Sequence, residues 1–168
     1  MWPDRRLLDL FKTEFPIVQS PMAGAMDHEL VIAAAQGGAL GSLPCAMIPV
    51  EKAREQFNII RQRISAPINM NFSCQKVVEA DPARMAEWKQ RLAPFYRELG
   101  LDPAAPVAVT DRAPFNAAMC ELVEEVKPEV VSFHYGLPDQ ALVKRGHAGG
   151  ALVMSVVPDG RGAVWARQ

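Results

Sequence analysis

Five short apolar runs alternate along the chain with segments whose apolar residues recur every three or four positions. The runs cover residues 15–20, 39–43, 67–72, 129–134 and 151–155. Apolar runs of this length are typical of buried strands, and helical segments between them are typical of βαβ units, whose strands pair in parallel. The pattern therefore predicts an α/β fold built on a parallel sheet.

The helix expected after the first run has recognisable ends. Asp27 suits the capping position, because its carboxylate accepts hydrogen bonds from the first backbone N–H groups, and Gly37-Gly38 suits the other end. Glycine in the following run, Gly41, predicts a close approach of backbone there. We expect the inner stripe of this helix to consist of Leu30, Ala33, Ala34 and Gly37.

Four further helices follow from the same pattern. One is expected at residues 49–64, another opens at Asp81, a third covers 114–127 and the last begins at Asp139. Proline removes a backbone donor and crowds the preceding turn, so Pro94 is expected to kink or interrupt the second of these helices. The connection at residues 101–112 is rich in proline, and the pattern weakens after residue 145.

Composition narrows the classes of partner. The formal net charge of the 168-residue chain is -1, which provides no basic surface for nucleic acid or membrane. No stretch approaches the roughly 20 apolar residues that cross a bilayer. The three cysteines are widely spaced, with no paired motif and no histidine at metal-ligand spacing. We therefore expect a cytoplasmic protein with buried thiols, no metal site, no nucleic-acid partner and no membrane contact.

Ligands of parallel α/β folds bind at the carboxyl ends of the strands, which directs attention to the residues there. Pro21-Met22-Ala23-Gly24 follows the first run, Asn69 and Asn71 lie two positions apart in the third, and His134 ends the fourth. Each has an alternative interpretation: a simple turn, a structural amide and a hydrogen-bonded core histidine. Together they are expected to converge around one edge of a planar ligand.

These stretches, with the segment 37–43, resemble the nitronate monooxygenases, formerly called 2-nitropropane dioxygenases, over roughly residues 15–142. The resemblance implies a parallel (β/α)8 barrel of the TIM type that binds FMN. It implies that Pro21, Met22, Ala23 and Gly24 line the isoalloxazine ring and that Asn71 bonds the ring edge. His134 is the candidate catalytic residue, in substrate binding or proton transfer.

The family's catalytic base is usually a histidine in a later Ala-Gly-Gly-His stretch, which this sequence lacks. His147 lies in a stretch whose order is reversed, and it is interpreted as a loop residue. His28 follows the cap of the first helix and is expected to be solvated.

A barrel of this type needs eight strands and about 250 residues, whereas about five strands are predicted here. We interpret residues 1–168 as one domain, the N-terminal half to two-thirds of the barrel, with a divergent tail at 156–168. The phosphate-binding loops implied after strands seven and eight are absent from the sequence. Unpaired barrel edges then favour self-association into a homo-oligomer.

The predicted activity is oxidation of a small alkyl nitronate by molecular oxygen to a carbonyl compound and nitrite. Two alternatives stay open at this point. One is a flavin-dependent enoyl-thioester or quinone reductase, which shares the barrel and the proline-methionine turn. The other is a catalytically inactive barrel fragment.

Overall fold

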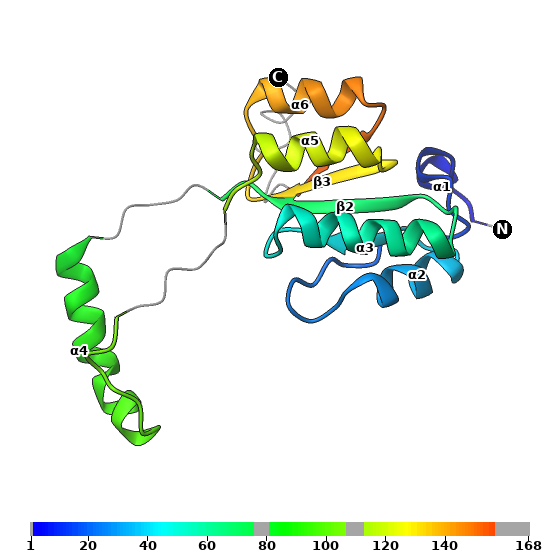
Figure 1. Cartoon of the computed structure of the whole chain (residues 1–168). Coiled ribbons are helices and arrows are strands. Elements are labelled where there is room, and N and C mark those ends of the chain that lie inside the picture. The colour runs from blue at the N-terminus through cyan, green and yellow to red at the C-terminus, as the bar shows by residue number, and fades with distance from the viewer. Residues whose placement is uncertain (1, 76–80, 107–112, 157–168) are drawn as a thin grey trace. The chain divides into compact units, whose positions relative to one another are not determined.

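The computed structural model describes residues 2–75, 81–106 and 113–156. The chain forms two compact units, one made of Met1–Gln75 with Arg112–Gln168 and the other of Lys76–Asp111. Each unit is considered by itself. The larger unit contains a sheet with helices along one face and a short helix at the end of the strands (Figure 1). Its elements are α1 Arg6–Phe11, α2 His28–Gln36, β1 Gly41–Pro44, α3 Val50–Arg63, β2 Ile68–Ser73, α5 Ala117–Val126, β3 Val130–His134, α6 Gln140–Ala148 and β4 Leu152–Ser155.

The four strands pair in parallel in the order β1-β2-β3-β4. Adjacent strands are joined by helices, as the right-handed crossover of βαβ units requires. The register places Asn69 beside both Ser42 and Val130, and Asn71 beside Ser132. The predicted parallel α/β class, of the barrel type, is therefore confirmed.

The first predicted strand, at residues 15–20, is wrong as a full strand. Only Val18 pairs there, through an isolated parallel bridge to Leu40. Leu40 N donates to Ile17 O, and Gln19 N donates to Leu40 O, both at 2.9 Å. Pro16 lies within the segment and Pro21 follows it, and neither has an N–H to extend the ladder. The segment still occupies the place of a strand beside β1, and self-association through this edge stays a prediction.

The helices cover the sheet face that carries the apolar side chains of alternate strand positions. Leu43, Met70, Phe72 and Phe133 are almost fully buried in this core. Ion pairs join neighbouring helices across it: Glu29 to Arg63, Arg54 to Glu125 and Glu124 to Arg145. The order α2, α3, α5, α6 thus follows the order of the strands that they cover.

The predicted inner stripe of α2 is wrong, although the predicted cap is confirmed. Asp27 accepts from Glu29 N, but the buried residues are Val31, Ile32 and Ala35, and Leu30 is 39% exposed. Two stripes satisfied the helical period, and the larger branched side chains are the ones that pack against β1 and α3. Leu30, Ala33, Ala34 and Gly37 lie toward the other side of the helix.

Gly41 confirms the predicted close approach of backbone. A Cβ at this position would lie 2.5 Å from Val31 O and 2.9 Å from Val31 Cγ1. Only glycine lets α2 lie this close to β1.

The smaller unit contains α4, Pro82–Glu98. The helix opens at Asp81 as predicted, and Asp81 caps it by accepting from Ala83 N and Arg84 N. The helix continues through Pro94, so the predicted interruption does not occur. None of its residues is buried, and its apolar side includes Trp88 at 52% and Phe95 at 60% exposure.

The short helix α1 closes the amino ends of the strands. Phe11 packs with Leu40 and Val130, and Met154 is partly buried against them. Leu40 precedes β1 and Val130 opens β3, and both lie on the sheet face away from the outer helices. The face therefore has an apolar layer at one end, and its remaining length leads to the carboxyl ends of the strands.

The interpretation of the whole chain as one domain stays a prediction, and the proposed divergent tail lies, beyond Val156, outside the described residues. Among the described residues no helix is long and apolar enough to cross a membrane. The cytoplasmic location stays a prediction.

Candidate functional site

A row of buried polar side chains crosses three neighbouring strands on the face opposite the helices. Ser42 of β1, Asn69 and Asn71 of β2, and Ser132 of β3 are each at most 4% exposed. The two-residue period of a strand places Asn69 and Asn71 on this face, while Met70 and Phe72 point to the helices. We call these four residues and His134 the polar ladder.

Asn69 is the central residue of the polar ladder on the side nearer the amino ends of the strands. Its Nδ2 donates to Ser42 Oγ at 3.0 Å and to Ser132 Oγ at 2.8 Å. Both amide hydrogens are therefore used, one toward each neighbouring strand. The amide acts as a bridge across the register in which β1, β2 and β3 pair.

One atom of this amide has no partner. Asn69 Oδ1 is buried and accepts no hydrogen bond, in a side chain that is 1% exposed. Turning the amide over would satisfy the oxygen through the two serine hydroxyls but would leave Nδ2 unpaired instead. In either orientation one end of the amide stays unsatisfied, and such a group costs free energy of folding.

Asn71, Ser132 and His134 form the part of the polar ladder nearer the carboxyl ends of the strands. Asn71 Nδ2 lies 2.8 Å from Ser132 Oγ and 3.3 Å from Ser132 O. His134 Nδ1 lies 3.1 Å from Asn71 Oδ1 and 2.9 Å from Asn71 Nδ2. Two of the predicted site residues, Asn71 and His134, are thus brought into direct contact at the carboxyl ends of β2 and β3.

The backbone holds this end of the sheet together. Cys74 N donates to His134 O at 2.9 Å, and Phe115 N donates to Ser73 O at 2.7 Å. On the helix side of this end, the Phe115 ring packs edge-to-face against Phe72 and Phe133, with centroids 4.8 and 5.1 Å apart. The rings of Phe72 and Phe133 are tilted to each other, with centroids 6.2 Å apart. The chain positions on either side of the imidazole are therefore fixed by packing and hydrogen bonds.

The predicted turn Pro21-Met22-Ala23-Gly24 lies at the surface. Met22, Ala23 and Gly24 are exposed, and Gly24 has a φ of +82°, which favours glycine. A side chain on Gly24 would meet no atom within 4 Å. No hydrogen bond among the described residues joins this turn to Asn71 or His134, so its convergence with them stays a prediction.

Gln19 links the segment before this turn to the polar ladder. Its Oε1 accepts from Ser42 N at 2.8 Å, while its Nε2 donates to Ser20 O and lies 3.0 Å from Met26 Sδ. The glutamine thus replaces backbone pairing where the segment leaves the sheet. It positions the start of the turn against β1.

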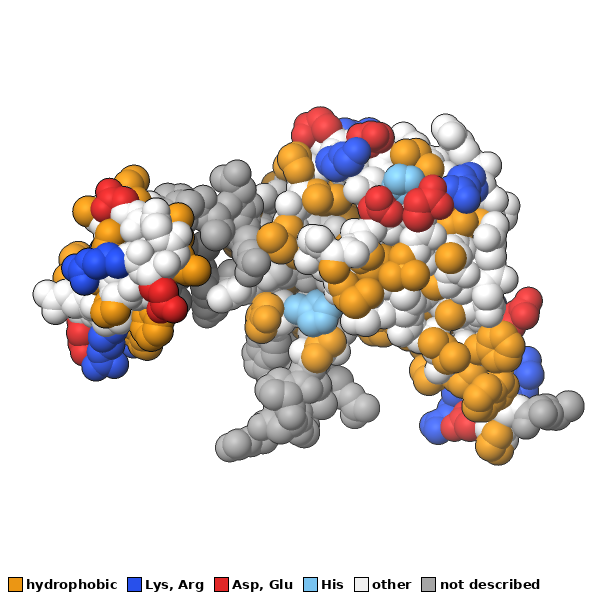
Figure 2. Space-filling view, turned by 90° about the horizontal axis from the view of Figure 1, so that it is seen from below, with side chains coloured by type: hydrophobic (Ala, Val, Ile, Leu, Met, Phe, Trp, Pro, Cys, Tyr) orange, Lys and Arg blue, Asp and Glu red, His pale blue; other side chains and the backbone are white. Residues whose placement is uncertain are grey.

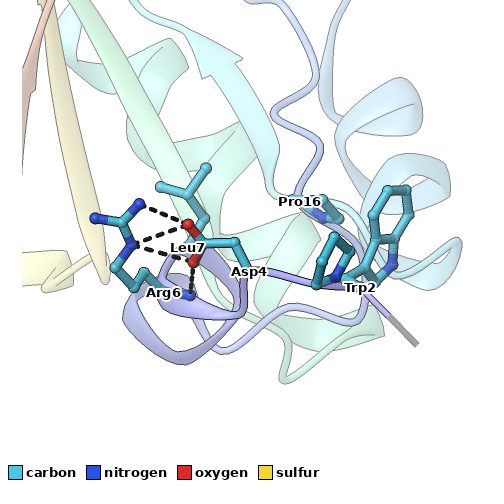
Figure 3. Close-up of a pocket in the computed structure, with 6 residues that line it drawn as sticks. Trp2, Asp4, Arg6, Leu7 and Pro16 are labelled. Carbon is cyan, nitrogen blue, oxygen red and sulfur yellow. Dashed lines mark hydrogen bonds and ion pairs between the residues drawn. The ribbon is translucent and has the colours of Figure 1, made fainter.

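A pocket of about 530 Å³ lies at the opposite end of the strands. Trp2, Pro3, Asp4, Arg6, Leu7 and Pro16 line it (Figure 3). Its polar groups pair with each other, since Arg6 Nη2 lies 2.5 Å from Asp4 Oδ2. Hydrophobic side chains gather near the N-terminus in Figure 2, where Trp2, Leu7 and Leu10 are 45 to 49% exposed. Nothing in this pocket involves the polar ladder.

The other two histidines do not join the site. His147 lies in the last turn of α6, so its interpretation as a loop residue is wrong; the helix continues to Ala148 despite Gly146. His28 opens α2 with a side chain 21% exposed, 3.5 Å from Glu29, so it is less solvated than expected.

Cys45 and Cys120 are buried as expected, whereas Cys74 is only partly buried. Burial raises the pKa of Cys45 to about 12 and that of Cys74 to about 11, and it raises the pKa of Cys120 as well. Such thiols are poor nucleophiles. No cluster of metal-ligating side chains occurs in the part of the chain that the structure describes.

Sequence reasoning did not single out Ser42, Ser132 and Gln19. Ser132 stands two positions before His134, just as Asn69 stands two before Asn71, so the period that paired the asparagines also applies to β3. Ser42 depends on the register between β1 and β2, which the sequence alone does not specify.

Comparison with known families matches residues 4–159 to the model described as nitronate monooxygenase. A curated nitronate monooxygenase from Paraburkholderia phytofirmans is 34% identical over 140 residues, which cover 83% of this chain and 38% of that protein. A second, from Pseudomonas aeruginosa, is 31% identical over 159 residues, which cover 92% of this chain and 45% of that protein. The chain thus spans less than half the length of these relatives.

Solved structures share the fold. A nitroalkane oxidase from Streptomyces ansochromogenes superposes with a TM-score of 0.78 at 23% identity, over 96% of this chain and 45% of that one. The M276A mutant of FabK from Thermotoga maritima superposes with a TM-score of 0.68 at 20% identity, over 96% and 42%. At these identities the likeness concerns the arrangement of strands and helices.

Proposed function

We propose that this chain, which belongs to the nitronate monooxygenase family, supplies part of a flavin site for nitronate oxidation. The reaction is oxidation of an alkyl nitronate by O2 to a carbonyl compound and nitrite. The observation that carries the proposal is the contact between Asn71 and His134 at the carboxyl ends of two adjacent strands. Ligands of parallel barrels bind at this end.

The residues present fit one edge of an isoalloxazine ring. Asn71 Nδ2 is used by Ser132, but Asn71 Oδ1 has a second lone pair that can accept a hydrogen bond from the ring edge. The open space around Gly24 leaves room for a flat group beside the backbone. FMN would supply the redox chemistry when bound. The resemblance to the family implies that residues outside the described ranges hold the FMN phosphate.

His134 is the proposed catalytic residue. Its Nδ1 is engaged by Asn71, so Nε2 is the ring atom available to hold or move a proton. An imidazole that takes up a proton at Nε2 becomes a cation that pairs with an anionic nitronate. The proposal thus gives Asn71 and His134 different tasks: one toward the ring, the other toward the substrate.

Flavin binding and turnover test the proposal separately. Purified protein mixed with FMN is expected to give a bound flavin absorbance band and to quench FMN fluorescence. Incubation with propionate 3-nitronate and O2 is then expected to release nitrite. NADH oxidation by an enone or a quinone without nitrite would instead favour the reductase, and protein that binds no flavin would favour the inactive fragment.

Two variants test whether Asn71 contacts the flavin ring. Asn71→Ala is expected to weaken FMN binding about tenfold, as loss of a hydrogen bond or two from a buried amide does. Asn58→Ala removes the same group from an exposed position on α3 and is the matched control, with unchanged binding expected. Equal binding by both variants and the unaltered protein would exclude Asn71 as a ring contact.

A further inference from the structure

Ser132 is placed to control the orientation of the Asn71 amide. It presents two oxygens to Asn71 Nδ2, its Oγ at 2.8 Å and its backbone O at 3.3 Å. The backbone oxygen only accepts, so the nitrogen end of the amide must face Ser132. The side chain of Ser132 is buried and so is that of Asn71, which removes water as a competing partner.

The orientation of the amide decides which nitrogen of His134 carries the proton. If the two oxygens of Ser132 take both amide hydrogens, Asn71 Oδ1 accepts from His134 Nδ1–H over 3.1 Å. If instead Nδ2 donates to Nδ1 over 2.9 Å, Oδ1 faces a ring nitrogen that carries no hydrogen and stays unpaired. A buried carbonyl without a donor is the more costly arrangement.

We infer that Ser132 is a positioning residue that holds the Asn71 amide so that the neutral His134 ring carries its proton on Nδ1. Nε2 is then left with its lone pair. Protonation at Nε2 creates a cation without disturbing the bond from Nδ1–H to Asn71, whereas protonation of the other tautomer would break the contact at Nδ1. The catalytic meaning of this tautomer rests on the function proposed above, but the tautomer itself does not.

The tautomer is measurable in the protein without flavin or substrate. The chain contains only three histidines, so two-dimensional 15N–1H spectra of the imidazoles at pH 8.5, where an ordinary imidazole is neutral, resolve each ring. The His134→Gln variant assigns the signals. In the unaltered protein we expect His134 Nδ1 at the protonated end of the nitrogen shift range and Nε2 at the unprotonated end.

Two serines of the polar ladder provide a matched pair of variants. Ser132→Ala frees one amide hydrogen for His134 Nδ1 and is expected to shift the tautomer ratio toward Nε2–H by about fivefold or more. Ser42→Ala removes an equally buried hydroxyl that bonds Asn69 but does not contact Asn71, and it is expected to leave the ratio unchanged. Ser132→Thr retains the hydroxyl and is expected to restore the original ratio.

Three results would overturn the inference: an Nε2–H tautomer in the unaltered protein, an unchanged ratio in folded Ser132→Ala, or an equal shift in Ser42→Ala. If Ser132→Ala does not fold, the unaltered protein and Ser132→Thr still decide, because both must show Nδ1–H. Failure of FMN binding or nitrite release leaves these spectra interpretable. The inference and the proposed function therefore fail separately.

Discussion

Replacement of Asn69 by leucine should change the stability of the protein very little, although the residue is 1% exposed. The change removes two hydrogen bonds, from Nδ2 to Ser42 Oγ and to Ser132 Oγ. A typical net contribution is about 1 kcal/mol each. It also removes the unpaired Oδ1, whose burial costs about 1 to 3 kcal/mol. The two effects oppose each other, so we expect a free energy of unfolding within about 1 kcal/mol of the original.

The neighbouring residue on the same strand is the control. Met70 is fully buried but points to the helices, into a core of apolar side chains. Met70→Ala creates a cavity there and is expected to cost about 2 to 5 kcal/mol. Two equally buried positions, one residue apart, are thus predicted to respond very differently.

Urea unfolding followed by far-ultraviolet circular dichroism measures both variants. The comparison is valid when the three proteins share one m-value, because the slope reports the surface exposed on unfolding. A loss above about 3 kcal/mol in Asn69→Leu at unchanged m-value would refute the reasoning, since it would mean that the amide is fully paired in the folded protein.

Three further changes test other parts of the fold. Gly41→Ala should cost about 3 kcal/mol or more by urea unfolding, because its Cβ meets the Val31 backbone at 2.5 Å. Gly146→Ala, in the last turn of α6 where a Cβ meets no atom within 4 Å, should gain about 0.5 to 1 kcal/mol. Glu129→Ala should cost about 1 to 2 kcal/mol, because its carboxylate accepts from the first N–H of β2; an unchanged midpoint would contradict this. Cys45, whose pKa burial raises to about 12, should resist thiol reagents at pH 8 until urea unfolds the protein. Because the unfolded thiol ionises from about pH 9 and the folded one does not, stability should fall as pH rises from about 9 toward 12.

The sequence predicted the order and type of most elements, because each rests on a local signal. Helix α1 was not predicted, and the strand expected at residues 15–20 forms only a single bridge. Asp27 caps its helix and another helix opens at Asp81, both as expected, and the apolar runs of β2 and β3 lie within one residue of their predicted bounds. The inner face of α2 was predicted wrongly because two stripes have the same period, and only contact with β1 and α3 distinguishes them. The helical period shows which residues share a face of the helix, whereas the face that is buried depends on the elements that pack against it.

In the candidate site, too, residues with a local signal were predicted and residues that depend on tertiary contacts were not. Asn71 and His134 were identified from their place at the ends of strands, and they lie in contact. Ser132 and Ser42 were missed because a serine in a strand carries little information until the register is known. Their role follows from pairing with a neighbouring strand, which places Ser42 beside Asn69 and Ser132 beside Asn71.

The two faces of the same strands differ in a way that supports the proposed ligand site on the face opposite the helices. Barrel interiors are usually filled by branched apolar side chains, and here Leu40, Val130 and Phe11 form such a layer at the amino ends. Toward the carboxyl ends of the strands, the polar ladder takes the place of these apolar side chains. Ser42, Asn69, Asn71 and Ser132 are too buried for contact with water to explain why they are polar. One amide of the polar ladder keeps an unsatisfied atom that leucine would eliminate. Stability alone does not account for that atom, which supports the proposal that the polar ladder orients Asn71 and His134 toward a bound ligand.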